Sequence, residues 1–369
     1  MPESALTVDD APVKPQRPGS LLARVRATAA QATVPLHVML ELTDRCNLRC
    51  QHCYVCSRPA EGELTLEAWK GILDQTAKAG ALFLTLTGGE PLLRRDFFDI
   101  AGYARARQFS LVLFTNGTLI TPEIADRVKG LCPERVEISI LGATAATHDG
   151  ITAVPGSFEG ALRAARLLIE RGVQVQLKTS LMRSNIGELE QIQTIAREMG
   201  ARFRSAFLII HRRDGDRGPA DLRATEEQLR AHVHSLFERV PNGKAPPKTP
   251  LLTEEQKKNA APCGAGTSSG RIDSRGMLYP CAAMNRPLGH LPNESFADLW
   301  VNHPDLKRLR AIRLSDLPEC SRCELLATCS RCAGAALMET GDMLAAPPQA
   351  CAITRAFESV FEAKRCDLQ

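Results

Sequence analysis

Three cysteines near the amino end of the chain have a spacing that suits an iron–sulfur cluster. Cys46, Cys50 and Cys53 form a C-x3-C-x2-C loop directly after an apolar run at residues 36–42. Cysteine thiolates are the usual ligands of [4Fe–4S] clusters, so three of them can hold three irons and leave the fourth iron open to a small molecule. A tetrahedral zinc site is the alternative, because Cys56 could supply a fourth ligand.

A second motif, Gly88-Gly89-Glu90, follows an apolar run at residues 81–86. Glycines in such a place let the backbone approach a ligand closely. The carboxylate of Glu90 can accept hydrogen bonds from an ammonium group. The alternative is a tight turn between a strand and a helix that begins at Pro91.

The last third of the chain carries another group of cysteines, in short segments rich in glycine and proline. They are Cys263, Cys281, Cys320, Cys323, Cys329, Cys332 and Cys351. The pairs at C-x2-C spacing favour metal binding, and a zinc ribbon is the structural alternative to iron–sulfur clusters. Cys132 lies outside both groups at the end of a predicted helix, so we expect it to be a buried core thiol.

The cysteine loop and the Gly88-Gly89-Glu90 motif together resemble the signature of the radical S-adenosylmethionine (SAM) family. His52 stands at the position where that family usually has an aromatic ring near the adenine of the cofactor. The resemblance implies that the open iron binds the amino and carboxylate groups of SAM. It also implies that the glycines and Glu90 hold the amino group.

Three residues at the ends of predicted strands are further candidates for contact with SAM. Asn116 follows the third apolar run, Ser139 lies near the end of the fourth, and Lys178 lies near the end of the fifth. Asn116 could instead form a turn, and Lys178 could instead extend to solvent. The family often has an acidic residue two positions after the serine, whereas this chain has Leu141 there.

The cysteines of the last third resemble the SPASM extension of radical SAM enzymes that mature peptides, which carries up to two auxiliary iron–sulfur clusters. By this resemblance the outer cluster would be held by Cys320, Cys323, Cys329 and Cys351, and the inner one by Cys263, Cys281 and Cys332. The inner set has only three thiols. The usual pattern has three residues between the last two clustered cysteines, and this chain has two, Ser330 and Arg331.

An alternation of apolar runs and helical periods must position these residues. Runs with the length and branching of buried strands lie at 36–42, 81–86, 111–115, 135–141, 173–181 and 203–210, and helical periods lie at 65–79, 96–107, 122–130, 157–171 and 187–199. Such alternation predicts an α/β fold with a parallel sheet covered by helices. Six units suit a partial (β/α)6 TIM-type barrel, which the family resemblance also implies. Ligands gather at the carboxyl ends of the strands in such folds.

Composition changes along the chain predict four segments. We expect an amino-terminal arm with a short helix at 1–34, the partial barrel at 35–215, a helical linker at 216–255 and the cysteine-rich SPASM domain at 256–369. The arm is too short for a peptide-recognition module, so any such module would be a separate chain.

The composition excludes several classes of partner. The net charge of +4 comes from 46 basic and 42 acidic residues, and no basic stripe with interleaved aromatics argues for nucleic acid. No apolar run approaches the roughly 18 residues of a membrane span, and the amino end lacks the apolar core of a secretory signal. We therefore expect a cytoplasmic protein whose 13 cysteines serve mainly as metal or cluster ligands rather than disulfides.

The resemblance implies that a reduced cluster passes one electron into SAM. The family products are methionine and a 5′-deoxyadenosyl radical, which abstracts hydrogen from the substrate. We expect the substrate to be a ribosomally made peptide or protein that is cross-linked, epimerised or oxidised, and an external electron donor of flavodoxin or ferredoxin type. The alternatives are a small molecule such as a haem precursor, oxidation of a serine or cysteine as in sulfatases, and a non-catalytic iron–sulfur or zinc scaffold.

Overall fold

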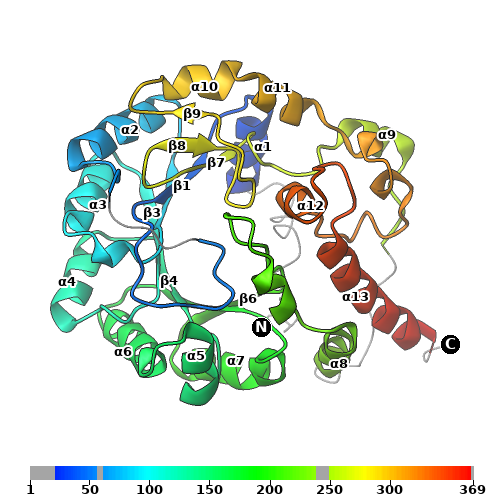
Figure 1. Cartoon of the computed structure of the whole chain (residues 1–369), viewed down its shortest axis with the longest axis horizontal. Helices are drawn as coiled ribbons and strands as arrows, with labels where there is room; N and C mark the ends of the chain where they lie inside the picture. Colours follow the sequence, from blue (N-terminus) through cyan, green and yellow to red (C-terminus); the bar gives the residue numbers. More distant parts are fainter. Residues whose placement is uncertain (1–20, 56–60, 238–248, 367–369) are drawn as a thin grey trace.

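The computed structural model describes residues 21–55, 61–237 and 249–366 of the chain. Its centre is a curved parallel sheet with helices on the outside (Figure 1). Six parallel strands form the first part of this sheet: β1 (His37–Glu41), β2 (Phe83–Thr87), β3 (Ser110–Thr115), β4 (Arg135–Ser139), β5 (Val175–Ser180) and β6 (Arg202–Ala206). Each strand pairs with the next one along the chain, so the predicted α/β partial barrel is confirmed.

Helices cover the outer face of these strands. They are α2 (Leu66–Lys78), the short η1 (Pro91–Leu93), α3 (Phe97–Ala106), α4 (Pro122–Gly130), α5 (Ala145–Thr152), α6 (Ser157–Glu170), η2 (Ile186–Glu188) and α7 (Leu189–Glu198). Thr65 and Thr121 cap α2 and α4, because each hydroxyl accepts a hydrogen bond from a backbone N–H of the first turn. Helix α5 was not predicted, since its polar sequence AATHDGIT has no clear apolar period.

Alternation along the strands separates an apolar outer face from a polar inner face. In β1 and just beyond it, Val38, Leu40 and Leu42 are buried in the main core under the helices. Successive side chains of a strand point to opposite faces, so Glu41 lies on the inner face of the curved sheet. Glu137 of β4 and Lys178 of β5 occupy the same inner face and form an ion pair at 3.9 Å. The interior of the barrel is therefore lined by charged side chains.

The sheet continues into the cysteine-rich part of the chain. Strand β7 (Ser269–Ile272) pairs parallel with β1, and β8 (Met277–Tyr279) and β9 (Gly289–His290) extend the sheet in antiparallel fashion. The described residues thus form one nine-stranded sheet with the order β6-β5-β4-β3-β2-β1-β7-β8-β9. The segment limits predicted at 215 and 255 remain predictions, but the sheet itself does not end there.

The remaining helices surround this extension. They are α1 (Leu21–Gln31), η3 (Gly218–Leu222), α8 (Glu226–Phe237), α9 (Glu254–Asn259), α10 (Phe296–Asn302), α11 (Pro304–Ala311), η4 (Leu314–Asp316), η5 (Cys320–Arg322), α12 (Ala333–Thr340) and α13 (Pro348–Cys366). Helices α8 and α13 lie side by side (Figure 1), with Val233 and Val360 buried between them. Across the described residues, no helix combines the length and apolar character that a membrane crossing needs.

One buried tryptophan joins the amino end, the extension and the barrel core. The ring of Trp300 in α10 is almost parallel to that of Phe296, and its Nε1–H donates to the carbonyl of Thr33 at 2.6 Å. It also lies against Gly270 of β7, where a Cβ atom would stand 2.9 Å from the Trp300 ring. Both aromatic residues belong to the same core as the six parallel strands.

Candidate active site

The Gly88-Gly89-Glu90 motif contacts the backbone that leads into the cysteine loop. The N–H of Gly89 donates to the carbonyl of Thr43 at 2.7 Å, and the N–H of Glu90 donates to the carbonyl of Arg45 at 2.8 Å. A Cβ atom on Gly88 would stand 2.3 Å from the Thr43 carbonyl oxygen, and one on Gly89 would stand 2.2 Å from that of Arg45. The two glycines are therefore required by a close backbone contact, which fixes the start of the loop that carries Cys46.

Glu90 is fully buried and its carboxylate is held in one orientation. It accepts hydrogen bonds from the Thr115 hydroxyl at 2.8 Å, the Asn116 N–H at 2.7 Å and the Leu92 N–H at 3.2 Å. Burial nevertheless raises the pKa of Glu90 to about 7, because these donors offset only part of the cost of removing a charge from water. An ammonium group bound beside this carboxylate would favour its ionised form.

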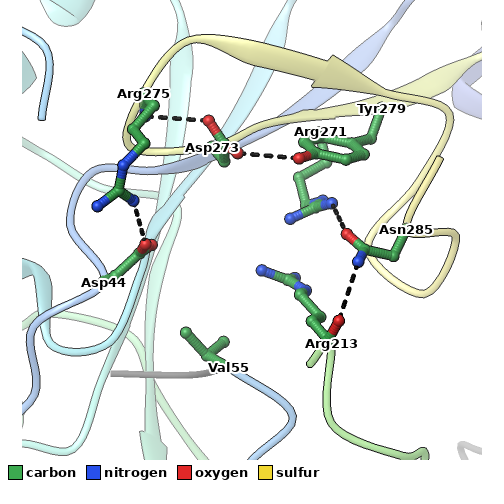
Figure 2. A pocket seen from close by; sticks show the side chains of 8 residues that line it. All are labelled: Asp44, Val55, Arg213, Arg271, Asp273, Arg275, Tyr279 and Asn285. Atoms are coloured by element: carbon green, nitrogen blue, oxygen red, sulfur yellow. Dashed lines mark hydrogen bonds and ion pairs between the residues drawn. The ribbon is translucent and has the colours of Figure 1, made fainter. Parts of the chain in front are cut away.

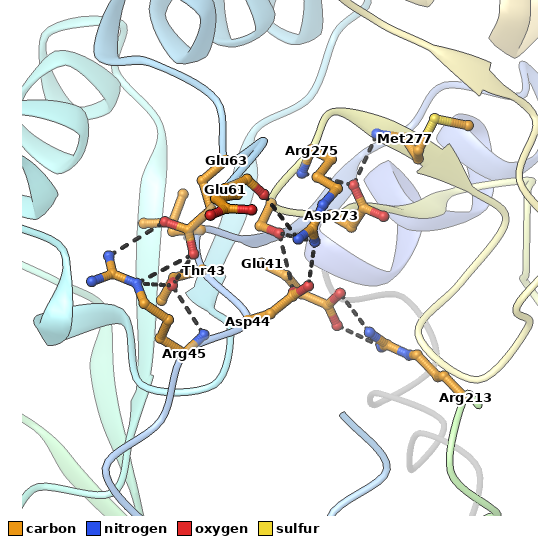
Figure 3. A network of polar contacts seen from close by, with 12 residues as sticks. Glu41, Thr43, Asp44, Arg45, Glu61, Glu63, Arg213, Asp273, Arg275 and Met277 are labelled. Carbon is orange, nitrogen blue, oxygen red and sulfur yellow. Dashed lines mark hydrogen bonds and ion pairs between the residues drawn. The ribbon is translucent and has the colours of Figure 1, made fainter. Parts of the chain in front are cut away.

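Ion pairs on both sides of the loop entry hold it in place (Figure 3). Arg94 donates to the carbonyl of Leu42 at 2.9 Å. Arg45 pairs with Glu63 at 3.3 Å, and the hydroxyl of Thr43 also donates to Glu63. From the extension, Arg275 pairs with Asp44 at 2.6 Å. The segment before Cys46 is thus fixed by contacts from the barrel and from the cysteine-rich part together.

The three loop cysteines are partly buried near one another. Burial, with smaller effects of Glu90 and Cys53, raises the pKa of Cys46 to about 11. Burial, with smaller effects of the other two loop cysteines, raises the pKa of Cys50 to about 12. These thiols become thiolates only beside a strong positive charge such as that of bound iron. Two groups donate hydrogen bonds to Cys46 Sγ: the Leu48 N–H at 3.4 Å and the Asn116 side-chain amide at 3.9 Å.

The structure brings Asn116 to this site with its side chain oriented. Its Nδ2 donates to Asn47 Oδ1 at 2.8 Å, and its Oδ1 accepts from the hydroxyl of Thr118 at 2.6 Å. Since its backbone N–H also donates to Glu90, Asn116 connects the carboxylate to the cysteine loop. Asn116 therefore does more than form the turn that Asn-Gly sequences favour.

The other predicted contacts lie at the same end of the barrel in different surroundings. Burial lowers the pKa of His52 to about 4, so its ring is neutral, and its Nδ1 has no hydrogen-bond partner among the described residues. Ser139 is exposed at the end of β4 and is paired in register with Lys178. The ammonium of Lys178 lies 4.5 Å above the Phe114 ring and beside Glu137. Leu141, at the position where the family often has an acid, is buried in a small apolar cluster.

The structure brings the cysteines of the last third into the two predicted sets. Cys263, Cys281 and Cys332 lie close enough for Cys332 to raise the pKa of both others, after the larger effect of burial. Cys320 and Cys323 act in the same way on Cys329 and Cys351. Within the described ranges no three His, Cys, Asp or Glu side chains meet the geometry of a site for a metal ion.

Three single cysteines lie outside these sets: Cys56, Cys132 and Cys366. The expectation that Cys132 is a buried core thiol is wrong: it is exposed, because the turn after α4 places it with a positive φ of 46° outside the helix. Cys56, the alternative fourth zinc ligand, lies outside the described residues.

Sequence reasoning missed a buried group of charges beside the loop. Glu41 at the end of β1 accepts hydrogen bonds from Nη1 and Nη2 of Arg213, at 2.7 and 2.6 Å, and from Nη1 of Arg271 at 2.7 Å. Burial would raise the pKa of Glu41, but Arg271 and Arg213 outweigh burial and hold the pKa below its usual value. The signal was present as a glutamate inside the largely apolar run at 36–42.

Comparisons with known proteins show which families this chain matches. Residues 40–195 match the model of the radical SAM superfamily, and residues 263–332 match that of the SPASM iron–sulfur cluster-binding domain. An AdoMet-dependent heme synthase of Methanosarcina barkeri is 30% identical over 347 residues, which are 86% of this chain and 97% of that protein. The mycofactocin maturase MftC of Mycobacterium tuberculosis is 32% identical over 330 residues, which are 86% of this chain and 83% of that protein.

The solved structures support the fold. Streptococcus suis SuiB, bound to precursor peptide SuiA, has a TM-score of 0.67 with this chain at 17% identity, covering 89% of this chain and 80% of SuiB. The chain belongs to the radical SAM superfamily and carries a SPASM domain. It is therefore an enzyme that uses a [4Fe–4S] cluster with bound SAM together with auxiliary iron–sulfur clusters.

Proposed function

We propose that this enzyme cleaves SAM reductively and modifies a ribosomally synthesised peptide or protein. The observation that carries the proposal is the contact between Gly88-Gly89-Glu90 and residues 43–45, which fixes a buried carboxylate beside a three-cysteine loop. The maturase name of a relative at 32% identity and the precursor peptide in SuiB support a peptide substrate. Cross-linking, epimerisation and oxidation are the outcomes that this proposal includes.

Each residue near the loop has a role in the proposal. Cys46, Cys50 and Cys53 would hold three irons, and the fourth would bind SAM. When bound and reduced, the cluster would supply the one electron that cleaves SAM to methionine and a 5′-deoxyadenosyl radical. Glu90 would hold the SAM ammonium, and Asn116 would orient both Glu90 and the Cys46 sulfur through its hydrogen bonds.

Three further residues would surround the rest of SAM. The neutral ring of His52 would lie near the adenine, and Ser139 near the ribose. Lys178 is partly exposed in the barrel interior, and we propose it for the SAM carboxylate, since its ammonium can leave the Phe114 ring by rotation of its flexible stem.

The auxiliary clusters would use the two cysteine sets of the last third. Cys320, Cys323, Cys329 and Cys351 would hold the outer cluster, while Cys263, Cys281 and Cys332 would hold the inner one. These clusters would accept the substrate electron after hydrogen abstraction or relay electrons from an external donor of flavodoxin or ferredoxin type. A separate peptide-recognition protein would present the substrate.

A haem precursor is the second candidate substrate. Its support is specific, because a relative named AdoMet-dependent heme synthase is 30% identical and matches over 97% of its own length. Both candidates share the cleavage of SAM and differ only in the molecule that loses hydrogen.

Anaerobic reconstitution with iron and sulfide, followed by dithionite and SAM, tests the shared step. We expect 5′-deoxyadenosine from the unmodified protein. The triple substitution of Cys46, Cys50 and Cys53 by alanine should abolish it while auxiliary iron remains. Cys132→Ala is the matched control, since that thiol is exposed and outside all three sets. Continued cleavage in the triple variant contradicts the proposal.

Deuterium transfer distinguishes the two substrates. A deuterated precursor peptide encoded beside this gene, or a deuterated tetrapyrrole, is incubated with the reduced enzyme and SAM. Deuterium in 5′-deoxyadenosine identifies the molecule that is attacked. Transfer from the tetrapyrrole alone would replace the peptide proposal with the second candidate.

A further inference from the structure

A small pocket lies where the barrel meets the cysteine-rich extension (Figure 2). It has a volume of about 90 Å³ and is lined by residues just before and just after the cysteine loop, from the segment after β6 and from β7 to the loop after β8. Arg213, Arg271, Arg275 and Asn285 supply most of its hydrogen-bond donors. None of the residues proposed to hold iron or SAM lines it.

Three guanidinium groups and three carboxylates meet at the pocket, and two of the guanidinium groups share one carboxylate. Glu41 is shared by the guanidinium groups of Arg213 and Arg271, so one of these two charges has no carboxylate of its own. Asp44 is already paired with Arg275 at 2.6 Å. Asp273, which also lines the pocket, accepts hydrogen bonds from neutral donors, the backbone N–H groups of Arg275 and Met277 and the Tyr279 hydroxyl.

Both arginines keep donors that the described residues do not use. Arg271 is 1% exposed, and its Nε has no hydrogen-bond partner among the described residues. Its Nη2 reaches Asn285 Oδ1 at the long distance of 3.5 Å. The Nε of the mostly buried Arg213 is likewise unpartnered within the described ranges. Leaving buried charged donors unsatisfied is costly, so such groups are expected to meet a ligand or an ordered water.

The arginines are held in fixed orientations. The guanidinium of Arg271 lies 3.6 Å from the centre of the Tyr279 ring, and that of Arg213 lies 4.8 Å from the Tyr54 ring. Figure 2 shows the guanidinium of Arg271 beside the amide of Asn285, which also donates to the backbone carbonyl of Arg213 at 3.3 Å. Planar guanidinium groups of this kind match the geometry of a carboxylate.

The pocket is joined directly to the cysteine loop. The N–H of Arg213 donates to the carbonyl of Tyr54 at 3.1 Å, and Arg212 Nε donates to the carbonyl of Cys53 at 3.3 Å. A group bound in this pocket would therefore lie at the same end of the barrel as the proposed SAM site.

We propose that this pocket binds a carboxylate of the organic substrate and so positions the substrate for hydrogen abstraction. The inference rests on the proposed function, because that function supplies the substrate. A peptide carboxylate and a tetrapyrrole propionate have the same chemistry, so both sources fit the pocket. The arginine pair is a positioning device and takes no part in the cleavage of SAM.

Binding of a small probe tests the carboxylate site without turnover. Trifluoroacetate and its neutral amide are titrated into the reconstituted protein and followed by the width of the fluorine NMR signal. We expect saturable broadening for the acid and none for the amide. Asn285→Asp places an internal carboxylate beside Arg271 at an exposed position and should weaken acid binding at least tenfold.

Two more variants separate the pocket from general charge effects. Arg213→Gln should also weaken acid binding at least tenfold, whereas Arg308→Gln removes the same charge from an exposed helix position and should not. Equal binding of acid and amide, or unchanged binding in both Asn285→Asp and Arg213→Gln, overturns the proposal. Asn285→Asp keeps the buried ion pairs intact, so its result does not depend on refolding around a lost charge.

Competition identifies the source of the carboxylate. A precursor peptide is compared with its carboxyl-terminal amide, and a porphyrin propionic acid is compared with its methyl ester. If an acid displaces the probe and its neutral amide or ester does not, that acid is the source of the carboxylate. Displacement by both forms overturns the carboxylate assignment. SAM cleavage by the unmodified enzyme is measured separately, so a failure of the proposed function is distinct from a failure of this site.

Discussion

Gly89 shows how little space the site leaves for change. A methyl group there would stand 2.2 Å from the carbonyl oxygen of Arg45 and 2.9 Å from that of Asp44. We predict that Gly89→Ala displaces the entry of the cysteine loop and lowers the rate of SAM cleavage about 100-fold, because a shift of about 1 Å in a reacting group has effects of this size. The measurement is 5′-deoxyadenosine formed per enzyme after reconstitution.

Gly102 provides the matched control for that substitution. It lies within α3, and a methyl group added there would meet no other atom within 4 Å. Gly102→Ala should leave SAM cleavage unchanged and stabilise the helix by about 0.5 to 1 kcal/mol. Equal rates for the two alanine variants would show that the close contact at Gly89 is dispensable.

His148 links the stability of the protein to pH. Its Nδ1 accepts the N–H of Leu141 at 3.0 Å, so that nitrogen carries no proton. Burial lowers the pKa of His148 from 6.5 to about 4. The unfolded chain therefore binds a proton between these pH values that the folded protein does not, and the free energy of unfolding falls as pH falls through that range.

The size of this effect can be measured by difference. Between pH 6.5 and 5.5 the free energy of unfolding of the wild type should fall by about 1 kcal/mol more than that of His148→Gln. In this variant the side-chain carbonyl can still accept a hydrogen bond from the Leu141 N–H. Anaerobic denaturant titrations at both pH values give the two free energies of unfolding. Parallel losses in both proteins would mean that His148 is already protonated or is not buried in solution.

At the residue scale, the sequence predicts what is encoded locally. The cysteine loop and Gly88-Gly89-Glu90 are short contiguous motifs, so their residues could be named before the fold was known. The group of Glu41, Arg213 and Arg271 could not, because Glu41 and Arg271 are separated by 230 positions and meet only through the pairing of β1 with β7. A charge within an apolar run was visible, but its partners were not.

At the element scale, α10 stabilises the junction between the barrel and the extension through Trp300. The side chain is 2% exposed and packs on Gly270 of β7. We predict that Trp300→Ala lowers the free energy of unfolding by about 3 to 5 kcal/mol, since it leaves a cavity and an unpaired Thr33 carbonyl. Val301→Ala on the exposed side of the same helix should change stability by less than about 0.5 kcal/mol. Denaturant titration of both variants checks the contrast, and similar losses would contradict it.

The length of a strand decides whether it could be predicted from the sequence. The six barrel strands appear as apolar runs of at least five residues, and each was predicted to within a few residues. Strands β7, β8 and β9 have four, three and two residues, too few to give a period. They form because β1 offers an unpaired edge and α10 covers them, and neither condition is visible in a local window.

At the scale of the whole molecule, the composition change near residue 255 suggests two separable parts, whereas the pairing of β1 with β7 makes them one sheet. Cutting the chain there would leave the edge of β1 open, and Glu41 and Asp44 would lose Arg271 and Arg275. Loss of one partner of a buried ion pair costs about 3 to 5 kcal/mol, a large part of the stability of an ordinary domain.

We therefore predict that residues 1–255 expressed alone do not unfold cooperatively and do not cleave SAM. Circular dichroism melts and the 5′-deoxyadenosine assay, each compared with the full chain, check this. A soluble fragment with a sharp transition and SAM cleavage would show that the barrel is stable without the strand that completes its edge.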